Sequence, residues 1–397
     1  MLLNKFKKIN IFTVLLFFFS ILYFYNLILI YQNFYNLNTT GLILINYDGG
    51  FLRRALLGEI ITSISLFLNF KIENVFIIIY ILNYSLFFYL NYLFFKEFKK
   101  NYIFYFFIFS PIYFTFSLGD VSSIYAEFLI QREVFLITFF LFYCYICKNS
   151  NNRLKVYIIG LSGVSLLTFL YELTIFCYPF FFYTYYVFLK KNKYLINFYE
   201  LVLSILIFVS IIFVHINFYG NNNFEIVIDN LNNNFGFNYS KDDFIFSWLN
   251  KDVSKQLIFL EQDFKINYIL RYIFYSHPII LLIFIGYKVF DDKIAFILII
   301  LSILSFIIVF AIAIDWARFV HILYCFTLYS ILLFLSKSKK LFYNLSKNTF
   351  FSKFNYTFLN YFVIFYCSMW TLKHTYWQNH LSYGIFQILK KNYLYLN

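Results

Sequence analysis

The most informative stretch of this sequence is YDGGFLRRALLGE, residues 47–59. It lies between two apolar runs, yet it contains two carboxylates (Asp48 and Glu59), two arginines (Arg53 and Arg54) and three glycines. The whole chain has only 19 acidic residues and 11 glycines, so this density of charge and glycine is unusual. We interpret the rest of the chain as a membrane scaffold that holds this stretch at the outer face of a bilayer.

The composition indicates a membrane protein. Of the 397 residues, 62% are hydrophobic and 26% aromatic, and the mean hydropathy is +0.72. The apolar runs are continuous over about 15–23 residues, which predicts membrane-spanning helices. They do not alternate between polar and apolar residues as the strands of a membrane barrel do. We therefore expect an all-α polytopic membrane protein with a single domain over residues 1–397 and a long external loop over 219–272.

The net charge of +13 raises the question of a nucleic-acid partner. Basic residues concentrate on the cytoplasmic side of membrane proteins. The expected topology places 19 of the 32 lysines and arginines inside, but only four of the 19 acidic residues. We therefore expect a lipid bilayer and no nucleic acid as partner. About eleven spans with a cytoplasmic N-terminus are expected, at 9–31, 75–95, 102–118, 134–147, 156–171, 173–189, 201–218, 273–290, 294–314, 319–335 and 357–372.

The apolar run at 55–70 is expected not to cross the membrane. Lysine-rich flanks at residues 5–8 and 96–100 belong on the same side, so an even number of spans lies between them. The runs at 9–31 and 75–95 supply that number. The run at 55–70 also has a polar helical face, which predicts an interfacial helix in the first external loop. Asp48 or the two glycines after it would cap or turn the start of this helix.

Charged residues near hydrocarbon are costly and are therefore candidates for function. Several such residues fall in short external turns, all on one side of the membrane in the expected topology. They are Asp48, Arg53, Arg54, Glu59, Asp120, Glu127, Arg132, Glu133, Glu172, Asp315, Arg318 and His321.

Arg53 and Arg54 lie where the interfacial helix is expected to begin. Cations are disfavoured at a helix N-terminus, whereas an anion is favoured there. Two arginines at such a place fit a bound phosphate or pyrophosphate. The alternative is that their side chains extend to lipid headgroups.

Asp48 is a candidate general base or, with a second carboxylate, a ligand of a divalent metal ion. The second carboxylate would come from Asp120, Glu127 or Glu133. The alternative is an ion pair that holds the external loops together. For Glu133, which stands at the entry of a span, a structural pair between helices is the favoured use.

Three further positions complete the candidate site. Glu172 stands alone in a turn between two apolar runs, so we expect a partner for it. Asp315 and Arg318 are three residues apart and can form a local salt bridge or bind substrate. His321 lies one turn further on, where it either extends the site or has a structural role.

The layout of residues 1–133 resembles that of C-type polytopic membrane glycosyltransferases, including O-antigen-type polysaccharide polymerases. The resemblance rests on Asp48 and the interfacial helix in the first external loop, on Arg53 and Arg54, and on the acidic loop at 120–133. It implies transfer of sugar or glycan units from a polyprenyl-(pyro)phosphate donor. Such transfer takes place at the outer face of the bacterial inner membrane, in surface polysaccharide assembly.

The resemblance also implies roles for the candidate residues. Catalytic roles fall to Asp48, Asp120, Glu127 and Glu133. Binding of phosphate or substrate falls to Arg53, Arg54, Arg132, Glu172, Asp315, Arg318 and His321. Some members carry two adjacent acidic residues, whereas here Asp48 precedes two glycines. A divalent metal ion therefore stays an open alternative, and no other cofactor is expected.

Two other classes of function remain open. A transporter or flippase of lipid-linked glycans would need charges deep within spans and helices broken near the membrane midplane. The sequence shows few charges at the centres of the expected spans. A non-enzymatic membrane assembly subunit would leave the external charges scattered, whereas an enzyme would gather them at one site.

Overall fold

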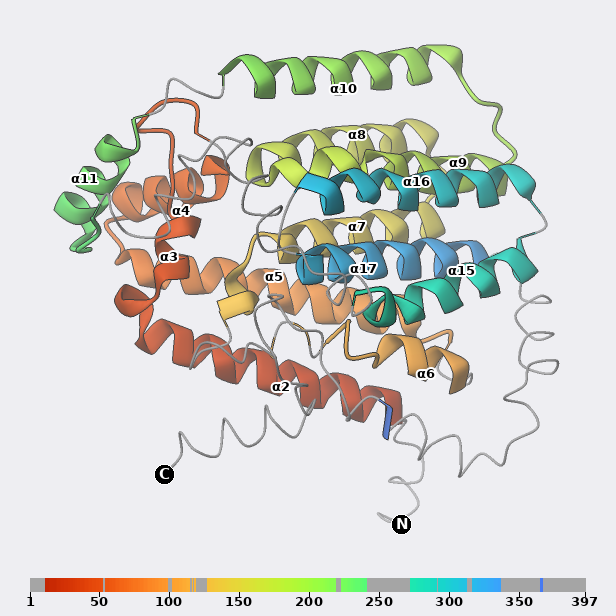
Figure 1. Ribbon diagram of the computed structural model, residues 1–397, viewed down its shortest axis with the longest axis horizontal. Helices are drawn as coiled ribbons and strands as arrows, with labels where there is room; N and C mark the ends of the chain where they lie inside the picture. Colours follow the sequence, from red (N-terminus) through yellow and green to blue (C-terminus); the bar gives the residue numbers. More distant parts are fainter. Residues whose placement is uncertain are drawn as a thin grey trace.

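The computed structural model describes residues 11–52, 54–98, 102–114, 116, 118, 127–218, 223–240, 272–290, 292–312, 316–336 and 365–366 (Figure 1). Every regular element in these ranges is a helix, as the sequence predicts. The elements are α2 (Ile11–Gln32), η1 (Phe34–Asn36), α3 (Asn38–Ile43), α4 (Ala55–Leu68), α5 (Ile72–Phe95), α6 (Tyr102–Ile108), η2 (Glu127–Ile130), α7 (Glu133–Asn149), α8 (Arg153–Leu170), η3 (Glu172–Cys177), α9 (Tyr178–Lys191), α10 (Phe198–Phe218), α11 (Phe224–Phe235), α15 (His277–Val289), α16 (Lys293–Ile312) and α17 (Trp316–Leu335).

Six of the described helices are long and apolar enough to cross a bilayer: α2, α5, α8, α10, α16 and α17. Within the most apolar 18-residue window of α17, 89% of the residues are buried, against 17% in α10. Helix α17 packs against α7, α9, α15 and α16 and forms the centre of the bundle. Helix α10 lies at its edge (Figure 1). The exposed apolar surface of α10 fits contact with lipid.

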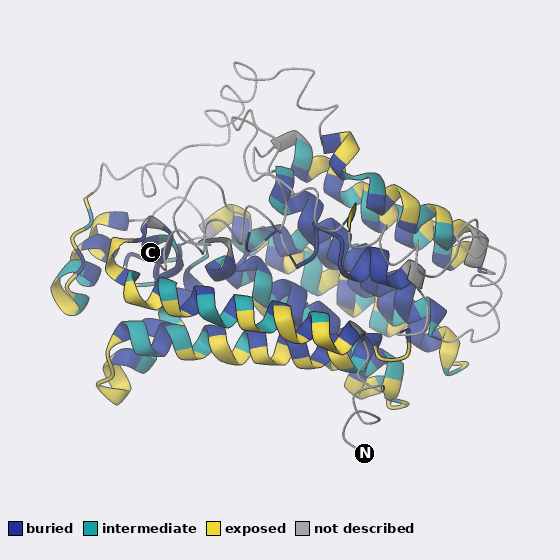
Figure 2. Cartoon of the chain, turned by 90° about the horizontal axis from the view of Figure 1, so that it is seen from below, coloured by how far each residue is buried: buried dark blue, intermediate teal, exposed yellow. Residues whose placement is uncertain are grey.

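Aromatic side chains fill the space between the central helices. The rings of Phe140 on α7 and Phe326 on α17 stack with their centroids 3.9 Å apart. Tyr23 on α2 packs edge-on against Tyr84 on α5. Large rings bury much apolar area and pack in defined geometries, so they fix how closely the helices approach. Figure 2 shows the result, with buried residues inside the bundle and exposed stripes along the outer helices.

The described ion pairs form two groups, one at each end of the bundle. Each of the five joins two residues that the charge count assigns to the same side of the membrane. At the lysine-rich end, which we call the basic end, the pairs are Glu97–Lys148 at 2.9 Å, Arg153–Glu200 at 2.7 Å and Lys190–Asp292 at 2.5 Å. At the opposite end the pairs are Arg54–Glu172 and Glu133–Arg318.

The expected span at 102–118 is not one continuous helix. Helix α6 ends at Ile108, and residues 111–114 form turns at Pro111, which has no N–H to donate. Irregular backbone within a bundle needs partners for its carbonyl groups. Tyr23 donates to the Phe114 carbonyl at 2.7 Å and Tyr324 to the Phe107 carbonyl at 2.6 Å. These side chains make the break in the helix tolerable inside the protein.

Helix α4 has 14 residues and is too short to cross the hydrocarbon core. Its protein-facing side includes Thr62 and Ser65 as well as Leu57 and Ile61, whereas Phe67 is 88% exposed. This mixed side of the helix faces the protein, where α4 packs against α3, α5 and α8. A Cβ at Gly58 would overlap the carbonyl group of Ile45, so glycine is what allows α4 to lie this close to the preceding loop.

The long external loop is described only at 223–240 and at its last residue, 272, and the last expected span only at 365–366. Within that part of the loop, α11 lies beside α3 and α4 (Figure 1). The Asn223 N–H donates to the Gly49 carbonyl at 3.1 Å, and a Cβ at Gly49 would overlap the Asn223 carbonyl group. Thr40 and Tyr239 are hydrogen-bonded at 3.1 Å. The loop therefore packs directly on the stretch that precedes α4.

Candidate functional site

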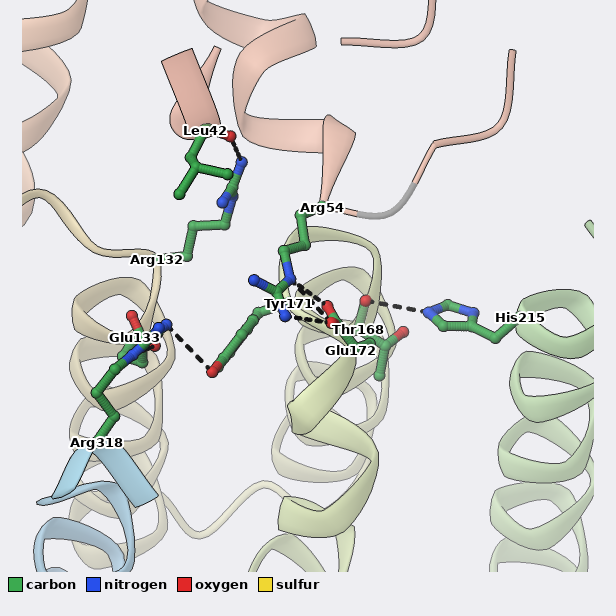
Figure 3. A network of polar contacts seen from close by, with 9 residues as sticks. All are labelled: Leu42, Arg54, Arg132, Glu133, Thr168, Tyr171, Glu172, His215 and Arg318. Carbon is green, nitrogen blue, oxygen red and sulfur yellow. Dashed lines mark hydrogen bonds and ion pairs between the residues drawn. The ribbon is translucent and has the colours of Figure 1, made fainter. Parts of the chain in front are cut away.

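Five charged side chains from four parts of the chain meet at the end of the bundle opposite the basic end (Figure 3). We call them the arginine cluster: Arg54 before α4, Arg132 and Glu133 at the start of α7, Glu172 at the start of η3, and Arg318 in the first turn of α17. The sequence predicts that charges from separate external turns share one surface, and in the structure these five side chains lie close together.

Arg54 and Glu172 form a two-pronged ion pair. The Arg54 Nε donates to both carboxylate oxygens at 2.9 Å, and Nη2 donates to Oε1 at 2.5 Å. Arg54 is the N-cap residue of α4, with φ 65° and ψ 17°. A non-glycine residue in this left-handed region is strained, and such strain concentrates at functional sites. Burial opposes the charge of Arg54, but the Glu172 carboxylate outweighs it and raises the pKa of the guanidinium.

Glu133 and Arg318 form the second pair, which is more deeply buried. The Arg318 Nε and Nη2 both donate to the Glu133 Oε1, with the Nε contact at 2.6 Å. The side chains are only 6% and 11% exposed. Tyr171 joins this pair to the first one. Its ring lies 5.2 Å from the Arg54 Cζ and 5.9 Å from the Arg318 Cζ, and Arg318 Nη2 donates to its hydroxyl at 3.4 Å.

Arg132 has no carboxylate partner among the described residues. It is 3% exposed, its Nη2 donates to the backbone carbonyl of Leu42, and its buried Nε has no acceptor in the described part of the chain. Burial, and then the like charge of Arg54, lower the pKa of Arg132 to about 10. The guanidinium is thus still charged at neutral pH. A buried cation with an unused N–H group is a candidate for binding an anion.

A small cavity adjoins the Glu133–Arg318 pair and extends into the bundle. Its volume is about 20 Å³, room for about one water molecule. Glu133, Arg318 and His321 line it together with aromatic rings from α2 and α5. His321 is 7% exposed, and its Nδ1 lies at hydrogen-bond distance from the Ile112 carbonyl oxygen. His321 therefore both borders the cavity and holds the irregular segment after α6.

Asp48 is exposed and bonds with its neighbour rather than with the helix. Asn46 Nδ2 donates to its carboxylate at 2.6 Å, and the Asp48 N–H lies 3.3 Å from Asn46 Oδ1. Glu59 accepts the Tyr47 N–H at 3.0 Å and so fixes this turn to α4. The expectation that Asp48 caps the helix is wrong, because α4 begins at Ala55 with Arg54 as N-cap. Asp48 remains a solvent-accessible carboxylate near the start of α4.

Several predicted site residues fall outside the described part of the chain: Arg53, Asp120 and Asp315, together with the side chain of Glu127. Their places in the site stay predictions. Arg318 pairs with Glu133. Glu172 has a partner, as expected, and the structure identifies it as Arg54. Among the described residues, no three His, Cys, Asp or Glu side chains are grouped so as to hold a metal ion. The second carboxylate that a metal at Asp48 would need is thus still a prediction.

The sequence did not point to Tyr171 or to the Leu42 carbonyl as parts of the site. Tyr171 lies in the same turn as Glu172, which was the available signal, but its place between two arginines depends on contacts far apart in the chain. Leu42 contributes a backbone group, which no side-chain pattern reveals.

No family model, curated protein or solved structure matches this chain. The function is therefore argued from the arginine cluster and from the distribution of charge between the two ends of the bundle.

Proposed function

We propose that this protein transfers sugar or glycan units from a polyprenyl-phosphate or polyprenyl-pyrophosphate donor, in the assembly of a surface polysaccharide. The observation that carries the proposal is the buried guanidinium of Arg132, which has no carboxylate partner among the described residues and lies beside Arg54. An anionic group bound there would satisfy the unused Nε and offset the positive charge.

The proposal includes a topology of about eleven spans. The basic end faces the cytoplasm, and the arginine cluster faces the outer side of the inner membrane. Lysine enrichment at one end supports this orientation. Each described ion pair joins two residues assigned to the same side, which supports the grouping of the loops.

In the proposed reaction an acceptor hydroxyl attacks the anomeric carbon of the donor. The new bond joins the acceptor oxygen to that carbon, the bond from the carbon to the phosphate oxygen breaks, and the hydroxyl proton passes to a carboxylate. Asp48 is the accessible candidate for that base, and Glu133 is a second one beside the cavity. Arg132, with Arg54 and Arg318, stabilises the charge that develops on the leaving phosphate.

One observation favours a second candidate, a transporter of lipid-linked glycans. Helix α6 stops at Ile108 inside the bundle, and Phe116, just beyond the irregular segment that follows, lines the cavity. Broken helices beside a cavity are a feature of transporters. The described buried charges (Arg132, Glu133 and Asp292), however, lie near the ends of the bundle rather than at its middle, which favours the enzyme.

The two functions can be distinguished by analysing the lipid-linked glycans of cells that lack the protein and of the same cells complemented with wild-type or variant genes. The wild-type gene should restore the elongated glycan, whereas Arg132→Ala and Asp48→Asn should leave the unextended donor to accumulate. Normal glycan length and amount with both variants, at equal protein levels in the membrane, would overturn the proposal. Donor retained on the cytoplasmic side, with transfer intact in lysed cells, would favour the transporter.

A further inference from the structure

The chain between the end of α9 and the first turn of α10 exposes large apolar side chains at the basic end of the bundle (Figure 1). Leu195 is 86% exposed and Tyr199 82%, and Ile196 and Phe198 are exposed as well. Leu154, in the first turn of α8, is a further exposed apolar residue at this end. Apolar side chains gathered on a surface mark a place where another molecule binds.

This exposed loop is held to the start of α8 by specific contacts. The Tyr194 hydroxyl donates to the Asn151 carbonyl at 2.7 Å, and the Tyr194 ring lies 5.9 Å from the Cζ of Arg153. Just beyond the loop, Arg153 donates to both carboxylate oxygens of Glu200, at 2.8 and 2.7 Å. The loop is therefore fixed in place while its apolar side chains stay exposed. We call residues 154–155 and 191–199 the loop surface.

Three exposed lysines belong to the loop surface: Lys155 in the first turn of α8, Lys191 at the end of α9 and Lys193 in the loop. None of them forms an ion pair with a carboxylate among the described residues, and Lys191 donates to the neutral carbonyl of Lys148. The described carboxylates at this end pair with other cations, namely Glu97 with Lys148, Glu200 with Arg153 and Asp292 with Lys190.

Lys193 stands where the end of a helix usually has glycine. Its φ is 57°, and the N–H of the following Tyr194 donates to the Leu189 carbonyl at 2.9 Å, the pattern of a left-handed helix end. A residue with a Cβ is strained in this conformation. The backbone therefore gives no reason for a lysine at this position, whereas a positive charge needed at the surface does.

A partner that matches the loop surface has negative charge and apolar chains side by side. A soluble anion or a nucleic acid would leave Leu195 and Ile196 in water, and a neutral lipid would leave the lysines without a counter-charge. The loop surface also lies at the ends of α8 and α10, two helices long and apolar enough to cross a bilayer. Lysine and tyrosine side chains in such a place reach the lipid headgroups.

We propose that the loop surface binds an anionic phospholipid. Lys155, Lys191 and Lys193 bind the headgroup phosphate, and Leu195 and Ile196 contact the acyl chains. Helix α10 packs mainly on α8, so a lipid bound here also holds the start of α10 in place. The inference concerns the end of the bundle opposite the arginine cluster and does not depend on sugar transfer.

The test measures phospholipid binding to the full-length protein in detergent by native mass spectrometry. The probes are phosphatidylglycerol and phosphatidylcholine with the same acyl chains. Each lysine beside an anionic headgroup contributes a factor of about five in affinity, so the wild type should prefer phosphatidylglycerol by at least about tenfold. Lys193→Gln should weaken phosphatidylglycerol binding by about fivefold. The triple variant Lys155→Gln, Lys191→Gln, Lys193→Gln should lose the preference.

Lys71→Gln is the matched control, because Lys71 is an exposed lysine at the opposite end of the bundle, and it should leave the affinity unchanged. Leu195→Ser combined with Ile196→Ser should weaken the binding of both lipids and keep the preference. Equal wild-type affinity for the two lipids, or equal effects of Lys193→Gln and Lys71→Gln, would overturn the inference.

Two further outcomes would assign the loop surface to another partner. Displacement of phosphatidylglycerol by an equal amount of glycerophosphate, which has no acyl chains, would show a site for a soluble anion. A preference for phosphatidylglycerol that persists in the triple variant would leave the three lysines to an acidic protein. Either result would overturn the lipid assignment and leave the proposed function standing.

Discussion

The carboxylate of Glu172 accepts three hydrogen-bond contacts from the guanidinium of Arg54, although the two residues are 118 positions apart. This pair fastens the glycine-rich stretch before α4 to the turn between α8 and α9. The backbone of Arg54 is left-handed, so the contact is made from a strained position. The stretch 47–59 is thus ordered by a distant part of the chain as well as by its own sequence.

Substitutions at Arg54 should separate the ion pair from the backbone strain. Arg54→Ala and Arg54→Gly both remove the partner of Glu172, which should cost about 1–3 kcal/mol of stability. Glycine adopts the left-handed conformation freely, so Arg54→Gly should be about 1–2 kcal/mol more stable than Arg54→Ala. Thermal unfolding of the detergent-solubilised variants measures both differences. Equal stability of the two variants would show that the backbone at residue 54 is not left-handed.

The Glu133–Arg318 pair should contribute more to stability than the Arg153–Glu200 pair at the basic end. Glu133→Gln weakens a pair that is 6% and 11% exposed, and the cost should approach about 3–5 kcal/mol. Glu200→Gln weakens the more exposed Arg153–Glu200 pair and is the matched control, with a smaller expected loss. Denaturant titration of both variants in the same detergent gives the comparison. A larger loss from Glu200→Gln would contradict the assigned burial.

Gly58 should tolerate no side chain. In Gly58→Ala the new methyl group meets the backbone of Leu44 and Ile45, so α4 must move away. We expect a loss of about 1–3 kcal/mol in stability and a marked loss of transfer activity, because Arg54 moves with α4. Ser63→Ala, on the exposed side of the same helix, should change stability by less than about 0.5 kcal/mol. Similar behaviour of the two variants would place α4 elsewhere.

The orientation of the bundle can be tested with single cysteines. Asp229→Cys on α11 and Lys193→Cys at the basic end both replace exposed residues. A membrane-impermeant maleimide added to intact cells should label residue 229 and leave residue 193 unlabelled until the membrane is opened. Wild-type protein provides the background from the five native cysteines. Labelling of residue 193 alone in intact cells would reverse the proposed topology.

The helical membrane fold and the charges that gather at one end follow from local features of the sequence. Long apolar runs have one stable form in lipid, and an acid such as Glu172 between two of them must have a partner. The identity of that partner is not local. Arg54 and Glu172 are 118 residues apart, and Arg318 and Glu133 are 185 residues apart. Each pair can form only after the helices have packed.

Two predictions from the sequence, the span at 102–118 and the helix cap at Asp48, are wrong because of hydrogen bonds that the sequence pattern does not show. The run at 102–118 is apolar enough to be a span. Tyrosines from α2 and α17, however, donate hydrogen bonds to backbone carbonyl groups on either side of the break after α6 and so stabilise the irregular backbone. Asp48 has the side chain of a helix cap, yet it is hydrogen-bonded to Asn46 and lies seven residues before the helix begins at Ala55. In both places a competing hydrogen-bond partner, invisible in the pattern of the sequence, determines the conformation.

The central claim is that Arg132 binds the phosphate of a lipid-linked sugar donor during transfer. The most direct measurement is the rate at which the reconstituted protein transfers label from lipid-linked sugars extracted from cells that lack it. Arg132→Ala should reduce this rate by about 10²–10³-fold while Arg153→Ala, which breaks an ion pair at the basic end, leaves it within about twofold. A wild-type rate in Arg132→Ala, or no transfer by the wild-type protein, would contradict the account.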